Sequence, residues 1–496
     1  MSLRGGQPSK KPQPKPAPYG RGAVIVRELS KRIRTKEQAM SEPTTKEPGR
    51  QTGATALEGA HSRHEVVQTS LERAEEAAHL GGFITLDRDA AAKTSDEPGP
   101  LSGMTLAIKD NIHVAGLPNT AGTPALRDFV PPCDAPAVRR LRDAGAVILG
   151  KANMHELAFG ITSNNQAFGP VRNPRDPSRF AGGSSGGVAA LVAAGVVRAG
   201  LGTDTGGSVR VPAAVVGICG LRPTVGRYPG EGVTPLSSTR DTIGPMGRRV
   251  ADLVLLDGIL SGDDAPVAAR PPRSIRLGVP TGHFTDPLQD EVAVQWETAL
   301  RNLEAAGVDL VPVDVSSFTA GEFATGMAIV LYEARVELSA YLAKYRPQTD
   351  LATLAALIAG PDVRGVFEGC ILDGAPGLVS EDVYRECLAQ RQRLRAAYAD
   401  TFAAHGLDGL VFPTTPATAL DLATCDQGMI LRGEDADTFA TFIRNTGPAS
   451  VIGAPGLSIP MGVATNGLPT GLEIDAPVGA DRELLALGLT LEEMCG

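Results

Sequence analysis

Phe180-Ala-Gly-Gly-Ser-Ser-Gly-Gly187 and Gly202-Thr-Asp-Thr-Gly-Gly-Ser-Val-Arg210 are the two segments that decide the fold and chemistry of this chain. Each contains a serine, Ser184 or Ser208, that follows a pair of glycines. Glycine has no Cβ, so backbone N–H groups can crowd around a carbonyl that such a serine attacks. Upstream, Lys109 ends a short apolar run. The three side chains are a candidate nucleophile, proton relay and base.

Ser208 is the best candidate nucleophile. It follows a predicted strand that ends at Leu201 and opens a predicted helix. The N–H groups of Thr205, Gly206, Gly207 and Ser208 itself are therefore expected to converge on an oxyanion, helped by the positive end of the helix. Taken alone, the pattern also fits a glycine-rich turn with a serine N-cap.

Ser184 and Lys109 would complete a proton path. A serine hydroxyl can pass a proton between a nucleophile and a base. Lys109 can be that base only when neutral, which requires burial or nearby positive charge to lower a pKa of ~10.4. Its place after an apolar run predicts the end of a buried strand, whereas Asp110 would raise the pKa if it faced the amine. The alternatives are a Ser-Gly turn and a surface lysine.

Other charged residues near the two segments have supporting roles in this interpretation. Asp204 and Arg210 flank Ser208 and are expected to pair across the turn, which would hold the loop rigid. Arg222 is expected to be structural, and His155 to make a structural hydrogen bond.

One competing motif uses the same residues. Gly182-Gly-Ser-Ser-Gly186 also fits the Gly-x-Ser-x-Gly elbow of α/β-hydrolases, in which a downstream histidine is the base. Only His283 and His405 follow Ser184, and neither lies in a recognisable motif. The lysine-based interpretation is therefore favoured.

The pattern as a whole resembles the amidase signature family. The likeness is continuous from Gly182 to Thr224 and extends from about residue 56 to residue 496. Flanking blocks that agree are Gly150-Lys-Ala-Asn-Met-His-Glu-Leu-Ala-Phe-Gly160, Thr242-Ile-Gly-Pro-Met246 and Gly467-Leu-Pro-Thr-Gly-Leu-Glu473.

The resemblance implies a fold and a site. The fold is one large α/β/α unit with a mixed, mostly parallel central sheet covered by helices. The catalytic triad is Lys109, Ser184 and Ser208, with a cis peptide bond before Ser184. The resemblance also places Ala158 and Phe159 in the acyl pocket. It implies neither a metal nor an organic cofactor.

The implied activity is hydrolysis of linear amides through an acyl-enzyme on Ser208. The likeness is greatest to indoleacetamide hydrolases and mandelamide amidases, so an arylacetamide or aryl amide is the expected substrate. Carbamate, ester or anilide hydrolysis by the same triad is an alternative. A glutamyl-tRNA amidotransferase A subunit is another, although Thr239-Arg-Asp-Thr242 differs from the Asp-Gln form expected there. A binding protein with an inactive site is the third.

Composition limits the partners and the organisation of the chain. The net charge is −9, and residues 1–50 carry 12 Lys/Arg against 4 Glu, so the rest of the chain is strongly acidic. An acidic body argues against nucleic-acid binding, and no apolar run approaches the ~20 residues of a membrane span. Six scattered cysteines without a signal peptide indicate a cytoplasmic protein. We expect a small-molecule substrate, and a homodimer as the oligomer if one forms.

The sequence also predicts how the chain is divided into segments. Residues 1–50, rich in Pro and Lys, are expected to be a disordered extension, with Met40 as an alternative start. Residues 51–496 would form the amidase signature domain, with a helical cap over about residues 321–405. Strands are expected at 83–86, 104–108, 146–149, 275–279, 310–315, 410–412, 457–460 and 472–474, and helices at 137–144, 187–197, 291–306, 381–405 and 482–493.

Overall fold

The computed structural model describes residues 62–90 and 99–495, so the predicted extension over residues 1–50 lies outside the described residues. Its framework is one eleven-stranded sheet. From one edge to the other, the strands are β1 (Phe83–Leu86), β3 (Val147–Ala152), β2 (Thr105–Lys109), β6 (Ala199–Asp204), β8 (Thr242–Gly247), β7 (Cys219–Arg222), β14 (Gly456–Val463), β15 (Pro469–Asp475), β11 (Gly409–Pro413), β9 (Arg276–Thr281) and β10 (Asp309–Asp314). Two short ladders lie apart from it: β4 (Asn164–Asn165) with β5 (Gly169–Pro170), and β12 (Met429–Leu431) with β13 (Glu434–Ala436).

Parallel pairing occurs in two blocks of this sheet. β2 pairs parallel with β3 and β6, and β9 pairs parallel with β10 and β11. The strands between the blocks pair antiparallel, as does β1 with β3. The predicted α/β unit with a mixed sheet covered by helices is confirmed. The expectation of mostly parallel pairing holds in the two blocks and not between them.

One face of the sheet is covered by four helices that are amphipathic or apolar. In the longest of them, the buried residues Val292, Trp296, Ala299 and Leu303 recur at the three- and four-residue spacing of a helix face. That helix ends at Gly307, which has a φ of 95°. The four are α3 (Pro136–Asp143), α6 (Val250–Ser261), α7 (Asp290–Ala306) and α15 (Asp481–Cys495).

The opposite face carries the helices that follow the two glycine-rich segments. α4 (Gly186–Ala193) and α5 (Arg210–Val216) are short, rich in Gly, Ala and Val, and almost wholly buried. Small side chains let α4 lie close to the neighbouring backbone: a Cβ on Gly187 would be 2.3 Å from the Asn153 carbonyl oxygen. α2 (Arg63–Glu76), which has a capping box made by Ser62 and Glu65, contacts β2 and β3 and adds its buried residues to the same core cluster as α4.

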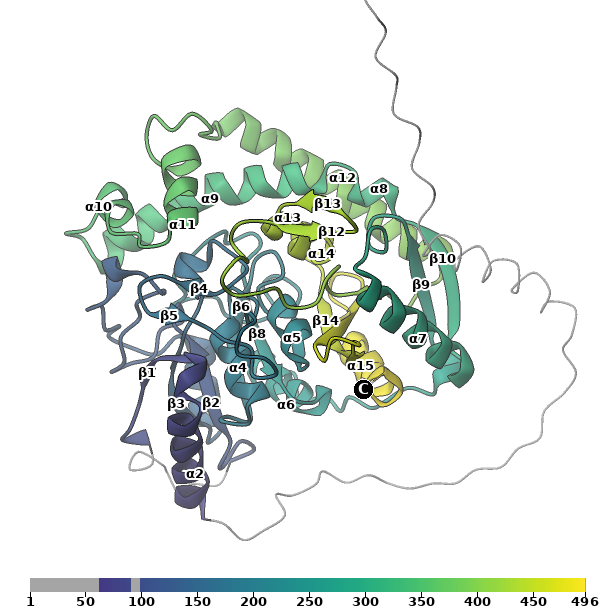
Figure 1. The fold of residues 1–496 in the computed structure, drawn as a ribbon, viewed down its shortest axis with the longest axis horizontal. Coiled ribbons are helices and arrows are strands. Elements are labelled where there is room, and N and C mark those ends of the chain that lie inside the picture. Colours follow the sequence, from purple (N-terminus) through teal and green to yellow (C-terminus); the bar gives the residue numbers. More distant parts are fainter. Residues whose placement is uncertain (1–61, 91–98, 496) are drawn as a thin grey trace, which may run out of the picture.

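A helical layer lies over one end of the molecule. Figure 1 shows α9 (Glu322–Tyr345) and α12 (Glu381–His405) running beside each other there. The predicted cap over residues 321–405 contains these two helices, and the division of the chain into domain and cap stays a prediction. The other short helices are α8 (Ser316–Thr319), α10 (Leu351–Ala356), α11 (Pro361–Val366), α13 (Thr438–Ile443), α14 (Gly447–Ile452), η1 (Ala78–Leu80), η3 (Pro124–Leu126), η4 (Glu156–Ala158), η5 (Pro272–Ser274) and the π-helical η6 (Phe367–Ile371).

Three elements of the central sheet differ from the sequence prediction. β7 and β8 were not predicted, because β8 contains two glycines and a proline, which are disfavoured in strands. The strand predicted to end at Leu201 continues to Asp204. Its last residues are polar but fully buried, so hydropathy alone ends the strand too early.

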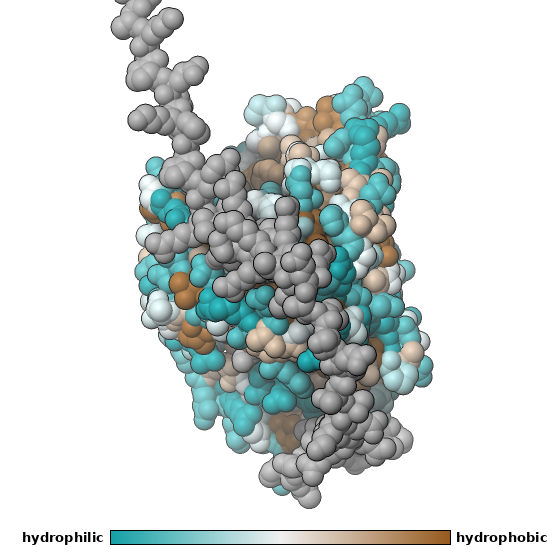
Figure 2. Space-filling model, turned by 90° about the vertical axis from the view of Figure 1, so that its right-hand side faces the viewer, coloured by the Kyte–Doolittle hydropathy of each residue, from teal (hydrophilic) through white to brown (hydrophobic). Residues whose placement is uncertain are grey.

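The surface is predominantly hydrophilic where it can be seen. Figure 2 shows a face on which hydrophobic residues lie singly or in small groups among hydrophilic ones. Among the described residues, no helix combines the length and the apolar composition that a bilayer crossing requires. All six cysteines are free thiols.

Candidate active site

Lys109 is the last residue of β2 and is completely buried. Its Nζ donates to Ser184 Oγ at 2.7 Å and to Thr203 Oγ1 at 2.7 Å. The structure thus joins two residues that lie 75 positions apart. Thr203 belongs to β6, the strand beside β2. Sequence reasoning missed Thr203, although it lies inside the second glycine-rich segment.

Burial lowers the pKa of Lys109 from 10.5 to about 7, while the charges of Asp204 and Asp241 partly oppose this. The neighbouring Asp110 does not face the Lys109 amine. It pairs instead with Lys151, whose Nζ lies 3.1 Å from Asp110 Oδ1. A large fraction of Lys109 is therefore neutral near pH 7 and able to accept a proton.

Ser184 lies at the turn that leads into α4. Its side chain is fully buried, and the Gly183–Ser184 peptide bond is cis, as the resemblance implies. The carbonyl of Ser184 accepts a hydrogen bond from His155 N at 3.1 Å. Its hydroxyl faces Lys109 and not a histidine: His283 Nε2 lies 3.1 Å from the Arg444 carbonyl oxygen. The geometry therefore disfavours the α/β-hydrolase scheme.

Ser208 lies in the loop between β6 and α5 and opens into a cavity of about 320 Å³. It is 8% exposed. Its carbonyl accepts from Ser185 N at 3.1 Å, which ties the Ser208 loop to the residue after Ser184. Among the described residues no hydrogen bond engages the Ser208 hydroxyl. The side chain is thus held at the cavity wall by its backbone while the hydroxyl stays available. The sequence predicts that Ser208 opens the following helix, whereas in the structure α5 begins at Arg210.

The loop before Ser208 presents backbone N–H groups to this cavity. Thr205 and Gly206 line the cavity, and the hydrogen bonds of the described residues leave the N–H groups of Thr205, Gly206 and Ser208 unused. Gly207 differs from the prediction: its N–H donates to Asp204 Oδ1 at 2.8 Å and is already engaged. The N–H groups available for an oxyanion are therefore those of Thr205, Gly206 and Ser208.

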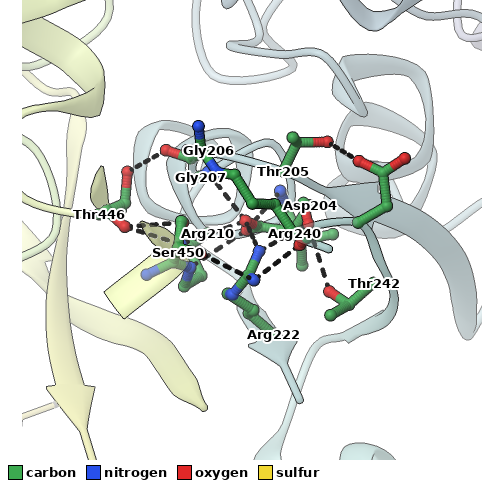
Figure 3. Close-up of polar contacts among 12 residues, drawn as sticks. Asp204, Thr205, Gly206, Gly207, Arg210, Arg222, Arg240, Thr242, Thr446 and Ser450 are labelled. Atoms are coloured by element: carbon green, nitrogen blue, oxygen red, sulfur yellow. Dashed lines mark hydrogen bonds and ion pairs between the residues drawn. The ribbon is translucent and has the colours of Figure 1, made fainter. Parts of the chain in front are cut away.

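A buried cluster of charges holds this loop from below (Figure 3). Arg210 donates to both carboxylate oxygens of Asp204 at 3.1 Å, and Arg222 donates to Asp204 Oδ1 at 2.9 Å. Burial would raise the pKa of Asp204, but the two guanidinium groups outweigh it, so the pKa lies well below its ordinary value. The predicted pairing of Asp204 with Arg210 is confirmed. It fixes the loop because Asp204 also accepts from the Gly207 N–H.

The cavity wall is mostly apolar. Ala158 and Phe159, which the resemblance places in the acyl pocket, both line it, and the Phe159 ring packs against Phe367 with centroids 5.2 Å apart. His155 also lines it, with Nε2 2.9 Å from Asp362 Oδ2. Other apolar lining residues are Ile161, Leu236, Met327, Val330, Leu331, Val366, Phe439 and Ile443.

Two further features of the wall were not found from the sequence. Arg240 contributes a buried guanidinium group, and Asp362, Asp426 and Asp437 contribute exposed carboxylates. Arg240 lies in the Thr239-Arg-Asp-Thr242 run noted in the sequence, but that run did not indicate a place in the cavity wall, and the three aspartates lie in segments without a motif. In the part of the chain that the structure describes, no group of three or more His, Cys, Asp or Glu side chains is arranged to hold a metal ion.

Comparison with known proteins agrees with this geometry. A family model described as Amidase matches residues 58–485. The chain belongs to the amidase family. This amidase is 41% identical to a mandelamide hydrolase of Pseudomonas putida over 455 residues, which are 87% of this chain and 88% of the relative. It is 40% identical to an indoleacetamide hydrolase of Agrobacterium vitis over 436 residues, which are 86% and 93% of the two chains.

A solved amidase structure has the same architecture. It superposes on this amidase with a TM-score of 0.78 at 35% identity and covers 88% of this chain and 97% of its own. The recognised family and the predicted enzyme class are therefore confirmed. The protein is a serine-dependent amidohydrolase, a hydrolase of amide carbon–nitrogen bonds.

Proposed function

We propose that this amidase hydrolyses small arylacetamide-type carboxamides through an acyl-enzyme on Ser208, with Ser184 as proton relay and Lys109 as base. The observation that carries the proposal is the 2.7 Å contact between Lys109 Nζ and Ser184 Oγ, made by a buried lysine whose pKa is lowered to about 7. A base with a pKa near the working pH is the most efficient proton acceptor.

The proposed proton path runs from Ser208 through Ser184 to Lys109. Neutral Lys109 takes the proton of Ser184, and Ser184 takes the proton of Ser208 as its oxygen attacks the amide carbon. The resulting oxyanion accepts hydrogen bonds from N–H groups of the Ser208 loop, chiefly those of Thr205, Gly206 and Ser208. Gly207 supports this oxyanion hole by fixing the loop through Asp204. Ser184 then returns a proton to the leaving nitrogen, and water hydrolyses the acyl-enzyme.

The cavity supports an aryl acyl group. Its walls are mostly apolar and aromatic, including Ala158 and Phe159, and its volume of about 320 Å³ suits a substrate with one ring system. The two relatives named above carry mandelamide and indoleacetamide in their names. Aryl carbamates, esters and anilides remain alternative substrates, because the same acyl-enzyme mechanism serves those leaving groups. Glutamine, the substrate of the amidotransferase alternative, fits an apolar wall poorly since it is zwitterionic.

The proposal also covers the size of the substrate, the cellular location and the oligomeric state. The substrate is a small molecule, and six free thiols in the described chain support a reducing, cytoplasmic location. A homodimer is proposed as the oligomer, to be checked by light scattering.

The test is hydrolysis of phenylacetamide, indole-3-acetamide, glutamine, a nitroanilide and an aryl carbamate by the wild type and by Ser208→Ala. We expect turnover of the arylacetamides that disappears in Ser208→Ala and persists in Ser316→Ala, a control at an exposed serine of α8. Activity confined to glutamine would favour the amidotransferase alternative. Activity that survives Ser208→Ala would refute the nucleophile assignment.

A further inference from the structure

Hydrogen bonds to carbonyl groups fix the first peptide unit of the Ser208 loop (residues 204–208). A peptide unit is planar, so a hydrogen bond to its carbonyl oxygen also sets the direction of the N–H on its opposite side. The Asp204 carbonyl accepts from Arg222 Nη1 at 2.6 Å and from Thr242 Oγ1 at 3.3 Å. These two bonds therefore set the direction of the Thr205 N–H, which belongs to the same peptide unit.

The later part of the loop contains one fixed peptide unit and one without a carbonyl partner. The Gly206 carbonyl accepts from Thr446 Oγ1 at 2.6 Å (Figure 3), and the Gly207 N–H of the same unit donates to Asp204 Oδ1. The unit between Thr205 and Gly206 differs, because among the described residues no hydrogen bond reaches the Thr205 carbonyl. The N–H of that unit is the Gly206 donor of the proposed oxyanion hole.

The side chain of Thr205 supplies the anchor that its carbonyl lacks. Thr205 is 7% exposed, and its hydroxyl donates to Asp241 Oδ1 at 2.5 Å. The other carboxylate oxygen, Asp241 Oδ2, accepts from the N–H groups of Leu236 at 2.8 Å and Ser237 at 2.9 Å. Both oxygens of Asp241 are thus engaged, which fixes the orientation of the carboxylate that holds Thr205.

The segment that carries Asp241 is attached to the two long helices over the cavity. Ser237 Oγ donates to Glu333 Oε2 of α9, and Thr239 Oγ1 donates to Glu333 Oε1 at 2.8 Å. The Tyr384 hydroxyl of α12 donates to the same Oε1 at 2.7 Å. Glu333 is 3% exposed. The position of Asp241 is therefore set by buried contacts with α9 and α12.

We propose that Asp241 is a positioning residue for amide hydrolysis, which acts through the Thr205 hydroxyl to direct the Gly206 N–H toward the oxyanion. This inference rests on the proposed function, which assigns the oxyanion hole, and adds to it a residue that does not line the substrate cavity. An oxyanion donor is effective only when it is already fixed where the charge develops. Loss of the anchor should therefore lower kcat more than it changes KM.

The kinetic test compares Thr205→Val with Thr205→Ser on phenylacetamide. Valine keeps the shape of threonine and lacks the hydroxyl, so we expect kcat to fall about 10- to 100-fold while KM changes by less than about threefold. Serine keeps the donor and should retain most of the wild-type kcat. Asp241→Asn should lower kcat at least as much as Thr205→Val, because an amide group cannot accept hydrogen bonds at both of its ends.

A second threonine–aspartate pair provides a matched control. Thr224 Oγ1 donates to Asp481 Oδ2 at 2.6 Å, and the Thr224 N–H donates to Asp481 Oδ1 at 2.8 Å. Neither residue lines the cavity. Thr224→Val should therefore lower stability in denaturant unfolding and leave kcat unchanged. A wild-type kcat in Thr205→Val, or an equal loss of kcat in Thr224→Val, would overturn the positioning role.

Inhibition by benzylboronic acid separates this inference from the proposed function. The Ser208 oxygen would bond to boron as its proton passes through Ser184 to Lys109, and one boron-bound oxygen would then occupy the oxyanion hole. We expect inhibition of the wild type, and an inhibition constant that rises in Thr205→Val by about the factor by which kcat falls. Equal inhibition of the wild type and Thr205→Val would overturn the role of Asp241 alone. Activity that survives Ser208→Ala, with no inhibition of the wild type, would refute the proposed function itself.

Discussion

Replacing Lys109 by methionine is predicted to lower kcat by orders of magnitude while making the protein more stable at neutral and acidic pH. Lys109 is completely buried, and burial lowers its pKa from 10.5 to about 7. At about 1.4 kcal/mol per pH unit, keeping this amine in the folded state costs about 5 kcal/mol below pH 7. Methionine fills a similar volume without that cost. The loss of the base should lower kcat by about 10²- to 10⁴-fold.

The stabilisation expected for Lys109→Met is reduced because one buried hydroxyl group loses its hydrogen-bond partner. Ser184 Oγ would lose its contact with Nζ, which costs about 1–3 kcal/mol for a buried group. Thr203 Oγ1 keeps a hydrogen bond from Asn111 Nδ2 at 3.1 Å. The net stabilisation is therefore about 2–4 kcal/mol at pH 6.

The sign of the pH dependence follows from proton binding. Between pH 7 and 10.5 the unfolded chain holds a proton on Lys109 that the folded protein has released, so wild-type stability rises with pH across this window. The advantage of Lys109→Met should accordingly shrink by about 2.5 kcal/mol from pH 6 to pH 9. In the wild type, kcat/KM should rise with pH and level off above about pH 7.

The assay is denaturant unfolding of the wild type and Lys109→Met at pH 6, 7, 8 and 9, together with the pH profile of kcat/KM. Lys344→Met, at an exposed lysine of α9, is the control and should show no such trend. A stability difference between wild type and Lys109→Met that stays constant from pH 6 to pH 9 would refute the low pKa, and with it the role of Lys109 as a neutral base.

Three other substitutions test the buried ion pairs, the cavity wall and the loop before Ser208. Asp204→Asn removes the carboxylate that Arg210 and Arg222 share, and although Arg210 keeps its ion pair with Glu473, Arg222 stays buried without its partner, so the free energy of unfolding should fall by about 3–5 kcal/mol in denaturant titrations; an unchanged value would contradict this. Phe159→Ala removes an aromatic wall of the cavity and should raise KM for phenylacetamide about tenfold with a smaller effect on kcat; a fall in kcat alone would argue against an acyl-pocket role. Gly207→Ala would bring a Cβ within 2.2 Å of Thr446 Oγ1 at a φ of 130°, so kcat should fall at least 100-fold in steady-state assays, and near wild-type activity would show that the loop tolerates displacement.

Periodicity and motif spacing were sufficient for much of the fold. The helix at Glu381–His405 and the strand at Phe83–Leu86 match the prediction, because each has a clear pattern and clear boundaries. β8 was missed, since its glycines and proline read as a turn until neighbouring strands provide pairing partners. β14 and β15 were predicted as strands, but their antiparallel direction was not, because the direction of a strand leaves no signal in its local sequence.

The site was predictable where single residues carry the chemistry. Lys109 and Ser184 were proposed from their own segments, and the structure places their side chains 2.7 Å apart. The engaged N–H of Gly207 was not predictable, because it depends on the direction of the Asp204 carboxylate. The place of Arg240 in the cavity wall was not predictable from the Thr239-Arg-Asp-Thr242 run, because its guanidinium group meets the Gly326 carbonyl of α9 only through tertiary packing.

The buried ion pairs around Lys109 have a common electrostatic consequence. Two buried carboxylates, Asp110 and Asp204, adjoin the lysine in sequence or in space, and either one unpaired would favour the protonated amine. Lys151 compensates Asp110, and Arg210 with Arg222 compensates Asp204. Buried ion pairs contribute little to stability compared with well-packed apolar groups. Burial is then the dominant influence on the pKa of Lys109, and the charges of Asp204 and Asp241 oppose it only in part. The Asp204 pairs that fix the Ser208 loop thus also help to keep the base able to accept a proton.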